Sequence, residues 1–391
     1  MNIVIGSSYL WRDCAKVGLH AFGEYFITKG CRVEWFTIPF SLFHLVKPTK
    51  LAIKWQRLAI ALGHPVLVND GGSVLINRVL FTIVHPVNLP FFNSYFVSRS
   101  YLRWTFPPLQ RVLRCDGVYP VDLLFFDSGG LNIYYPLHSM AKVVIYRLND
   151  LVAEFPGQVR GRVESEREIL RKVDLVLAVS ESLYEEAVRI RGTSKGVHLL
   201  PNGVNIEPFS KPWPEPADYK QIPSPRAIFV GSLSTWFDWE LLKEVATIRP
   251  SISFVLIGRG TAPVRLPKNV YLLGPRPHAE VPGYLLYADV GLILFKDLPR
   301  IARTEKPLKF YEYLAAGLPI VSVPYGNLKR MEPYALFGSD PIEFAEALDE
   351  AIKIGANQEE RNWRKAEASK FSWDNVFAQF DRILREEGLS I

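Results

Sequence analysis

The chain has 391 residues, of which 48% are hydrophobic, so it can bury two cores and is predicted to form two domains of about 200 residues each. Its net charge of +6 comes from basic residues interleaved with large apolar ones, and no nucleic-acid-binding motif appears, which argues against a nucleic-acid partner. The same charge suits a surface that meets anionic lipid and binds anionic substrates. Three distant cysteines, Cys14, Cys31 and Cys115, argue against a disulfide framework or a zinc site and favour a reducing compartment.

The first residues are typical of a strand rather than of a targeting segment. They contain no basic region and no long apolar stretch, so we expect no signal peptide. No run in the chain reaches the roughly 18 apolar residues of a membrane-spanning helix. A strand over 2–6, a helix over about 16–29 and a strand over 33–37 predict a βαβ start, with Ser7 and Ser8 in the loop after the first strand.

Two stretches of the first half, 47–62 and 89–114, combine basic with large apolar residues. In the first stretch, basic residues recur at helical intervals beside an apolar face: Lys47, Lys50, Lys54 and Arg57 against Leu51, Trp55, Leu58 and Leu62. This pattern predicts an amphipathic helix on an anionic membrane surface, so we expect a peripheral protein at the cytoplasmic face of a membrane. The alternative is that the aromatic residues are core and the basic ones form a solvated rim.

Polar residues follow two buried strands of the first half. The strand over 121–126 ends at Asp127, and the strand over 143–146 is followed by Asn149 and Asp150. Because ligands of open α/β sheets bind at the carboxyl ends of the strands, both aspartates are candidate site residues. The alternative for Asn149 and Asp150 is that they simply cap the following turn.

A proline-rich segment separates the two halves of the chain. A last strand and turn over 198–205 is followed by six prolines in a polar run over 206–225, which predicts a linker. The domains are therefore expected at 1–205 and 226–370, and residues 371–391 form a final helix.

The second half contains the segment with the clearest chemistry, residues 304–321. Pro307 opens a helix and Gly317 ends it, while Lys309 lies in the first turn, where free N-H groups and the helix dipole favour an anion. Leu308 and Glu312 share one face with Lys309, and a carboxylate there can accept hydrogen bonds from sugar hydroxyls. A phosphate beside a ribose indicates a nucleotide; the alternative is an ordinary surface Lys/Glu pair.

This segment, with its Gly-x-Pro-x-Val tail and the Pro-Asn-Gly-Val-Asn turn over 201–205, resembles the GT-B glycosyltransferases. The resemblance implies two Rossmann-like, doubly wound α/β domains facing a central cleft, with the final helix crossing back to the first domain. It also implies that Lys309 and Glu312 hold the diphosphate and ribose of a nucleotide sugar. Loops after three further strands would line the nucleotide through Gly231 and Ser232, Arg259, and Arg276. In the first domain, GT-B enzymes often bind an acceptor or donor phosphate in the loop after the first strand, so Ser7 and Ser8 would contact the acceptor; the alternative is a plain strand-to-helix connection. Asp127 is a further candidate for acceptor binding because of its place at a strand end.

The absence of an Asp-x-Asp motif disfavours a metal-bridged diphosphate. The leaving diphosphate would then be neutralised by helix dipoles, Lys309, Arg259 and Arg303. Within the fold, the chain looks most like the membrane-associated bacterial glucuronosyltransferases of the xanthan type. That resemblance implies that Leu308, Lys309 and Glu312 hold UDP and that Asp150 is the general base.

The expected function is therefore a metal-independent, inverting transfer of a sugar, expected to be glucuronic acid, from a UDP-sugar to a lipid-linked glycan or polysaccharide acceptor. No cofactor besides the donor substrate is expected. A second hypothesis is a retaining GT-B enzyme of the two-glutamate type that uses Glu305. In many retaining members seven residues separate the two glutamates, whereas six separate Glu305 from Glu312 here. A third is a non-catalytic module that binds a nucleotide sugar or a membrane surface.

Overall fold

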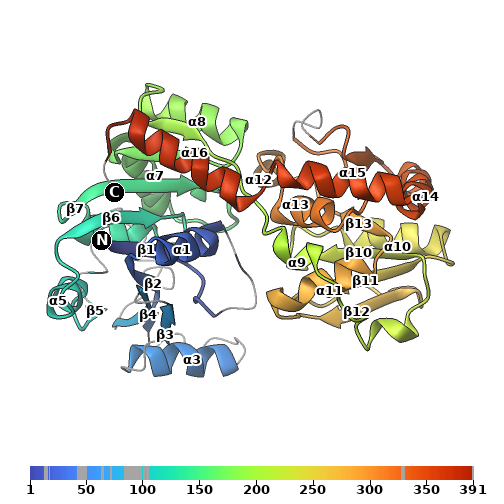
Figure 1. Cartoon of the computed structure of the whole chain (residues 1–391), viewed down its shortest axis with the longest axis horizontal. Helices are drawn as coiled ribbons and strands as arrows, with labels where there is room; N and C mark the ends of the chain where they lie inside the picture. Colours follow the sequence, from blue (N-terminus) through green and yellow to red (C-terminus); the bar gives the residue numbers. More distant parts are fainter. Residues whose placement is uncertain are drawn as a thin grey trace. The chain divides into compact units, whose positions relative to one another are not determined.

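The computed structural model describes residues 1–12, 16, 18–41, 51–62, 66–70, 73–82, 99, 102, 105–326 and 331–389. The chain divides into two compact units (Figure 1). The first unit comprises Met1–Pro201 and Phe377–Ile391, and the second comprises Asn202–Val376. Residues 206–225, predicted to be a linker, belong to the second unit, because large apolar residues between the prolines join its core: Phe209, Tyr219 and Ile222.

The first unit is built on a largely parallel sheet of order β3-β4-β2-β1-β6-β7-β8-β9, and β5 pairs with β4. Its strands are β1 (Asn2–Ser7), β2 (Arg32–Ser41), β3 (Val66–Asp70), β4 (Ser73–Thr82), β5 (Thr105–Phe106), β6 (Val121–Phe126), β7 (Ala141–Leu148), β8 (Leu175–Ala178) and β9 (Val197–Leu199). Only β3 and β5 run antiparallel to their neighbour among the described strands. The central strands are buried on both faces, as expected of parallel strands covered by helices.

The helices of the first unit are α1 (Gly18–Thr28), α3 (Leu51–Ala61), α5 (Leu109–Cys115), α6 (Tyr134–Leu137), α7 (Arg160–Lys172) and α8 (Glu181–Arg191). Short 3₁₀ turns lie at η4 (Leu131–Ile133) and η5 (Val152–Glu154). The final helix, α16 (Trp373–Glu386), closes this unit through aromatic contacts. The rings of Phe377 and Phe380 lie 5.3 and 5.2 Å from the ring of Phe22 in α1.

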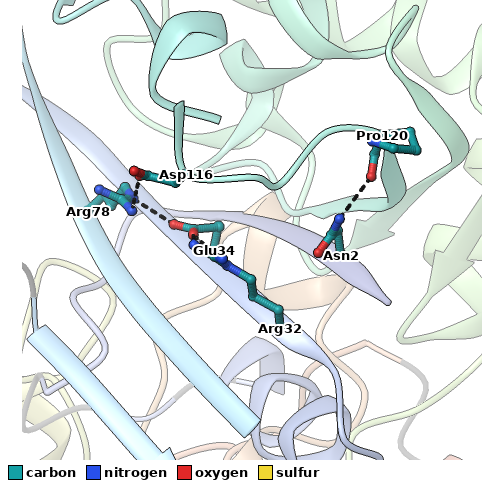
Figure 2. Close-up of polar contacts among 6 residues, drawn as sticks. All are labelled: Asn2, Arg32, Glu34, Arg78, Asp116 and Pro120. Carbon is teal, nitrogen blue, oxygen red and sulfur yellow. Dashed lines mark hydrogen bonds and ion pairs between the residues drawn. The ribbon is translucent and has the colours of Figure 1, made fainter. Parts of the chain in front are cut away.

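A buried charge cluster stabilises the sheet of the first unit (Figure 2). Glu34 in β2 is fully buried, and its carboxylate accepts from Arg32 Nη2 at 3.1 Å and from Arg78 Nε at 2.6 Å. Arg78 also pairs with Asp116 at 2.5 Å. These arginines compensate the desolvation of the Glu34 carboxylate. The cluster lies in the amino-terminal half of β2, away from the strand ends that bind ligands in such sheets, so we interpret it as structural.

The second unit contains a fully parallel sheet of order β12-β11-β10-β13-β14-β15. Its strands are β10 (Arg226–Val230), β11 (Ser253–Ile257), β12 (Val270–Gly274), β13 (Val290–Ile293), β14 (Ile320–Ser322) and β15 (Ala335–Phe337). The chain runs outward from β10 to β12 and then returns to β13 on the other side of β10 (Figure 1). This reversal is a topological switch point, where open α/β sheets bind their ligands.

The helices of the second unit are α9 (Glu207–Ser210), α10 (Trp239–Ile248), α11 (Val281–Leu286), α12 (Pro299–Ala302), α13 (Leu308–Ala315), α14 (Pro341–Ala356) and α15 (Gln358–Ser369), with 3₁₀ turns η6 (Tyr219–Gln221) and η7 (His278–Glu280). The predicted stop of α13 at Gly317 is confirmed. Gly317 has φ +77°, Gly317 N donates to Leu314 O, and Leu318 N donates to Tyr313 O, which is the Schellman arrangement. Pro307 is the N-cap of the helix rather than its first residue.

Candidate active site

The loops after β10 and β11 pack backbone against backbone. Gly231 N donates to Ile257 O at 2.9 Å, and Leu233 N donates to Arg259 O at 2.8 Å. A Cβ added to Gly258 would lie 1.6 Å from Gly231 O, so a side chain at Gly258 would force the loops apart. Ser232 is exposed at the end of β10, and Arg259 is half-buried in the β11 loop.

The side chain of Lys309 lies close to Gly231, the first residue of the loop after β10. Its Nζ is 4.6 Å from the ring centroid of Phe229 and 4.7 Å from that of Phe295, and it would lie 3.3 Å from a Cβ on Gly231. Burial lowers the pKa of Lys309 to about 8, although the nearby Glu312 acts in the opposite direction. The structure therefore brings Gly231 and Lys309 together and holds a cation at the carboxyl end of the central strand.

Helix α13 is anchored at the switch point by Tyr313. Its hydroxyl accepts from Val230 N at 3.1 Å and lies 3.1 Å from Leu292 O, so it connects α13 to both β10 and β13. A Cβ on Gly291 would lie 2.4 Å from the Tyr313 ring, so the strand must carry a glycine there for the helix to approach. This anchoring fixes the positions of Leu308, Lys309 and Glu312. The role of Tyr313 was not predicted, because its partners lie far away in the sequence.

Glu312 contacts a residue that the sequence reasoning missed. Its Oε1 lies 2.8 Å from His278 Nε2 at the start of η7, after β12. The side chain of Glu312 is 16% exposed and that of His278 is 49% exposed. The loop that carries His278 was predicted to line the nucleotide, but nothing in the sequence indicated that this residue would reach α13.

Arg276, predicted to bind the donor, has other partners in the structure. Its Nη2 donates to Asp218 at 2.7 Å, its Nε to Tyr284 Oη at 2.9 Å, and its Nη1 to Leu273 O at 2.6 Å. These bonds pin the loop after β12, so the structure gives Arg276 a stabilising role in that loop. Its donor contact stays a prediction.

Arg303 and Glu305 lie in the segment between α12 and α13, and both are half-buried. Because this segment follows β13, it belongs to the same edge of the sheet as the loops after β10 and β11. Their contacts with the donor stay predictions.

In the first unit, the loops after β1 and β6 also pack closely. A Cβ on Gly130 would lie 2.2 Å from Gly6 O, and one on Gly129 would lie 2.6 Å from Ser8. Ser7 is buried and its Oγ accepts from Tyr9 N at 3.3 Å, while Ser8 O accepts from Arg57 of α3 at 3.1 Å. The acceptor contacts predicted for Ser7 and Ser8 stay predictions.

Asp127 is buried at the end of β6. Its Oδ1 accepts from Gly129 N at 2.8 Å and from Gly130 N at 3.2 Å. Burial raises the pKa of Asp127 to about 7; the two amides oppose this rise and the charge of Asp150 adds to it. Because the Asp127 carboxyl group accepts hydrogen bonds from the backbone of the loop that follows it, it stabilises that loop. A direct contact of Asp127 with an acceptor stays a prediction.

Asp150 follows β7 and is half-buried, in the field of two buried carboxyl groups. The second is Glu166 of α7, which accepts from Tyr146 Oη at 2.6 Å and from Val152 N at 2.8 Å. Burial raises the pKa of Glu166 to about 7, and Asp150 adds to this rise. The structure thus brings Asp127 and Asp150 together at neighbouring strand ends, and it adds Glu166, which the sequence reasoning missed.

Among the described residues, no three His, Cys, Asp or Glu side chains gather in a way that could hold a metal ion. In the same residues, no helix combines the length and hydrophobicity needed to cross a bilayer.

Known proteins match both the sequence and the fold. Residues 224–353 match the family model described as glycosyl transferases group 1. The protein of Bacillus subtilis named as teichuronic acid biosynthesis glycosyltransferase TuaH is 28% identical over 72% of this chain and 71% of its own length. The structure of HepE from Anabaena in complex with UDP-glucose superposes with a TM-score of 0.66 at 14% identity, over 98% of this chain and 99% of HepE.

A third similar protein is a trehalose-6-phosphate synthase whose structure is described in connection with glycosyl transfer with retention. It has a TM-score of 0.63 at 14% identity and is covered, like this chain, over its full length. At these identities the two structures show the fold alone, whereas the family model matches the residues that form the site around Lys309. The chain is therefore a glycosyltransferase with the GT-B fold, and the match to the group 1 glycosyl transferases lies within its second unit.

Proposed function

We propose that the chain transfers a sugar from a UDP-sugar to a lipid-linked glycan or polysaccharide at a membrane surface, with inversion and without a metal ion. Glucuronic acid is the proposed sugar. The observation that carries the donor part is the Lys309 ammonium beneath Gly231, with Glu312 one turn later on the same helix. The complex of HepE with UDP-glucose supports a UDP-sugar as the donor class.

The residues around α13 supply what a nucleotide sugar needs. The first turn of α13 and Lys309 neutralise the diphosphate, and Arg259 and Arg303 add positive charge as the leaving group departs. Glu312 accepts hydrogen bonds from the ribose hydroxyls. Because Lys309 is held between two rings before the donor arrives, little reorganisation is needed when charge develops on the diphosphate.

Asp150 is the proposed general base. It takes the proton from the acceptor hydroxyl as that oxygen attacks the anomeric carbon, while the bond to the UDP oxygen breaks and UDP leaves with the electron pair. One displacement of this kind inverts the anomeric configuration. The position of Asp150 after β7, at the edge of the sheet that binds ligands, supports this role.

A retaining transfer is the second candidate, because the similar trehalose-6-phosphate synthase is described in connection with retention. In that case Glu305 would lie near the reacting sugar. The anomeric configuration of the product, followed by NMR from the first turnovers, separates the two. We expect an α-linked UDP-sugar to give a β-linked product, and an α-linked product would refute the inverting mechanism.

The pKa of Lys309 gives a pH dependence to UDP binding. Lys309 is mostly protonated below pH 8, and a bound diphosphate favours the protonated form and raises its pKa. The affinity for UDP should therefore be full below about pH 8 and fall above it, by up to about tenfold per pH unit. Calorimetry in the presence of a chelator between about pH 7 and 9.5 measures this. A constant affinity over that range would contradict the assignment of Lys309 to the diphosphate.

The membrane part of the proposal is supported by α3. Ile60 is buried against Leu10, Phe40 and Val79, whereas Trp55 is 58% exposed and Leu62, just after the helix, is 71% exposed. Large apolar side chains thus face outward from a helix that also contains Lys54 and Arg57. Lys47 and Lys50 lie outside the described residues, as do residues 89–98, 100–101 and 103–104 of the second basic stretch.

Binding to anionic vesicles should fall steeply with salt, because each basic residue near such a surface contributes about 1 kcal/mol. Lys54→Glu should therefore weaken vesicle binding by at least about fivefold, and Trp55→Ala should weaken it at high salt as well. A matched control is Lys243→Glu on α10 of the second unit, which should leave vesicle binding unchanged. Flotation or tryptophan fluorescence measures the binding. If the protein ignores anionic vesicles at low salt, α3 is not a membrane-binding helix.

A further inference from the structure

The hydrogen bond between His278 and Glu312 joins two parts of the second unit that the sheet separates. His278 follows β12, at the edge of the sheet, and α13 is anchored over β10 and β13 by Tyr313. The strand order places β11 and β10 between β12 and β13. The 2.8 Å hydrogen bond therefore connects the loop after β12 to α13. The two strands between these elements, β11 and β10, are the ones whose loops contain Arg259 and Gly231.

Both partners of this hydrogen bond are held by other contacts. The loop that presents His278 is pinned by Arg276, which donates to Asp218 and to Leu273 O. On the other side, α13 cannot shift without losing the bonds of the Tyr313 hydroxyl. The imidazole must carry its proton on Nε2 to donate to Glu312, because an ionised carboxylate only accepts hydrogen bonds.

We propose that His278 is a positioning residue for the donor: its Nε2 holds Oε1 of Glu312, so that Oε2 is oriented to accept the ribose hydroxyls. This inference rests on the proposed function, in which Glu312 contacts the ribose. Within the described part of the chain, Glu312 Oε2 has no hydrogen-bond partner. A carboxylate fixed through one oxygen loses less rotational freedom on binding than one free to turn, and this preorganisation strengthens binding.

Calorimetry with UDP and with a UDP analogue that lacks the 2′ and 3′ hydroxyls tests the proposal. His278→Ala should bind UDP about tenfold more weakly, the fold-change expected when one hydrogen bond to a charged group no longer acts. The same variant should bind the analogue as tightly as the wild type does, because the analogue has no hydroxyls for Glu312. His278→Gln keeps an N-H donor on a side chain of similar length and should restore most of the UDP affinity. In kinetics, His278→Ala should raise the KM for the donor and leave kcat nearly unchanged.

A matched control exists in the first unit, where His198 Nε2 lies 2.7 Å from Glu387 Oε1. His198→Ala removes a histidine and glutamate pair of the same kind outside the donor unit, and it should not change UDP affinity. Equal losses for UDP and for the analogue in His278→Ala would overturn the proposal, since the effect would not pass through the ribose. Tighter UDP binding in that variant would overturn it too, because His278 would then compete with the ribose. If the wild type itself fails to bind UDP, the proposed function fails instead.

Discussion

Asp150→Asn is expected to lower sugar transfer by about 10²- to 10⁴-fold while leaving the affinity for UDP unchanged. The amide has nearly the same shape as the carboxylate but cannot take the proton of the acceptor hydroxyl. Steady-state rates of UDP release with acceptor present, compared with calorimetric UDP binding, separate a loss of catalysis from a loss of donor binding.

The choice of Asp150 over Asp127 follows from their surroundings. Asp127 is buried and its carboxylate accepts from the amides of its own loop, whereas Asp150 is half-buried beside it. A suitable control is Asp122→Asn, because Asp122 lies near the start of β6 and bonds to Asn2 N and Lys142. It should leave turnover nearly unchanged. Near-normal turnover in Asp150→Asn, or a product that keeps the donor configuration, would shift the catalytic role to Glu305.

Lys309→Ala is expected to weaken UDP binding by about 1.5–3 kcal/mol, the typical contribution of a charge-assisted hydrogen bond. The Nζ group lies 4.6 Å from the ring centroid of Phe229 in β10 and 4.7 Å from that of Phe295, which follows β13, so the ammonium is held near the carboxyl ends of both strands. Calorimetry in the presence of a chelator measures the loss.

The matched control for this variant is Lys243→Ala. Lys243 lies on α10 of the same unit and pairs with Glu240 on the surface, so its removal should change UDP affinity little. Undiminished UDP affinity in Lys309→Ala, or binding that strictly requires magnesium, would refute the metal-independent donor site.

The sequence predicted the extent of α13 well, because the signals that begin and end a helix are local. Pro307 and Gly317 delimit α13 within one residue, and the fold class follows from strands that alternate with helices and end in glycine loops. Lys309 and Glu312 share a helix face through their spacing alone. The approach of Lys309 to Gly231 required the structure, because the two residues lie on different elements of the sheet.

What the sequence could not predict depends on partners that are distant along the chain. Arg276 was predicted to line the nucleotide, yet its guanidinium donates to Asp218, in the segment predicted to be a linker. Glu166 was unremarkable in a charged helix, but folding buries it against Tyr146. The role proposed for His278 depends on its hydrogen bond to Glu312, a residue that is distant in the sequence. The roles of these three residues depend on burial and on contacts with residues distant in the sequence. Neither produces a pattern that can be recognised in a short stretch of sequence.

The decisive measurement is the release of UDP from a panel of UDP-sugars, with a chelator present and a lipid-linked glycan as acceptor. The wild type should release UDP from one member of the panel, with UDP-glucuronic acid expected to be the best donor, and Lys309→Ala should require higher donor concentrations. Absence of release from every UDP-sugar, with the protein folded and the acceptor present, would contradict a UDP-sugar-dependent transferase.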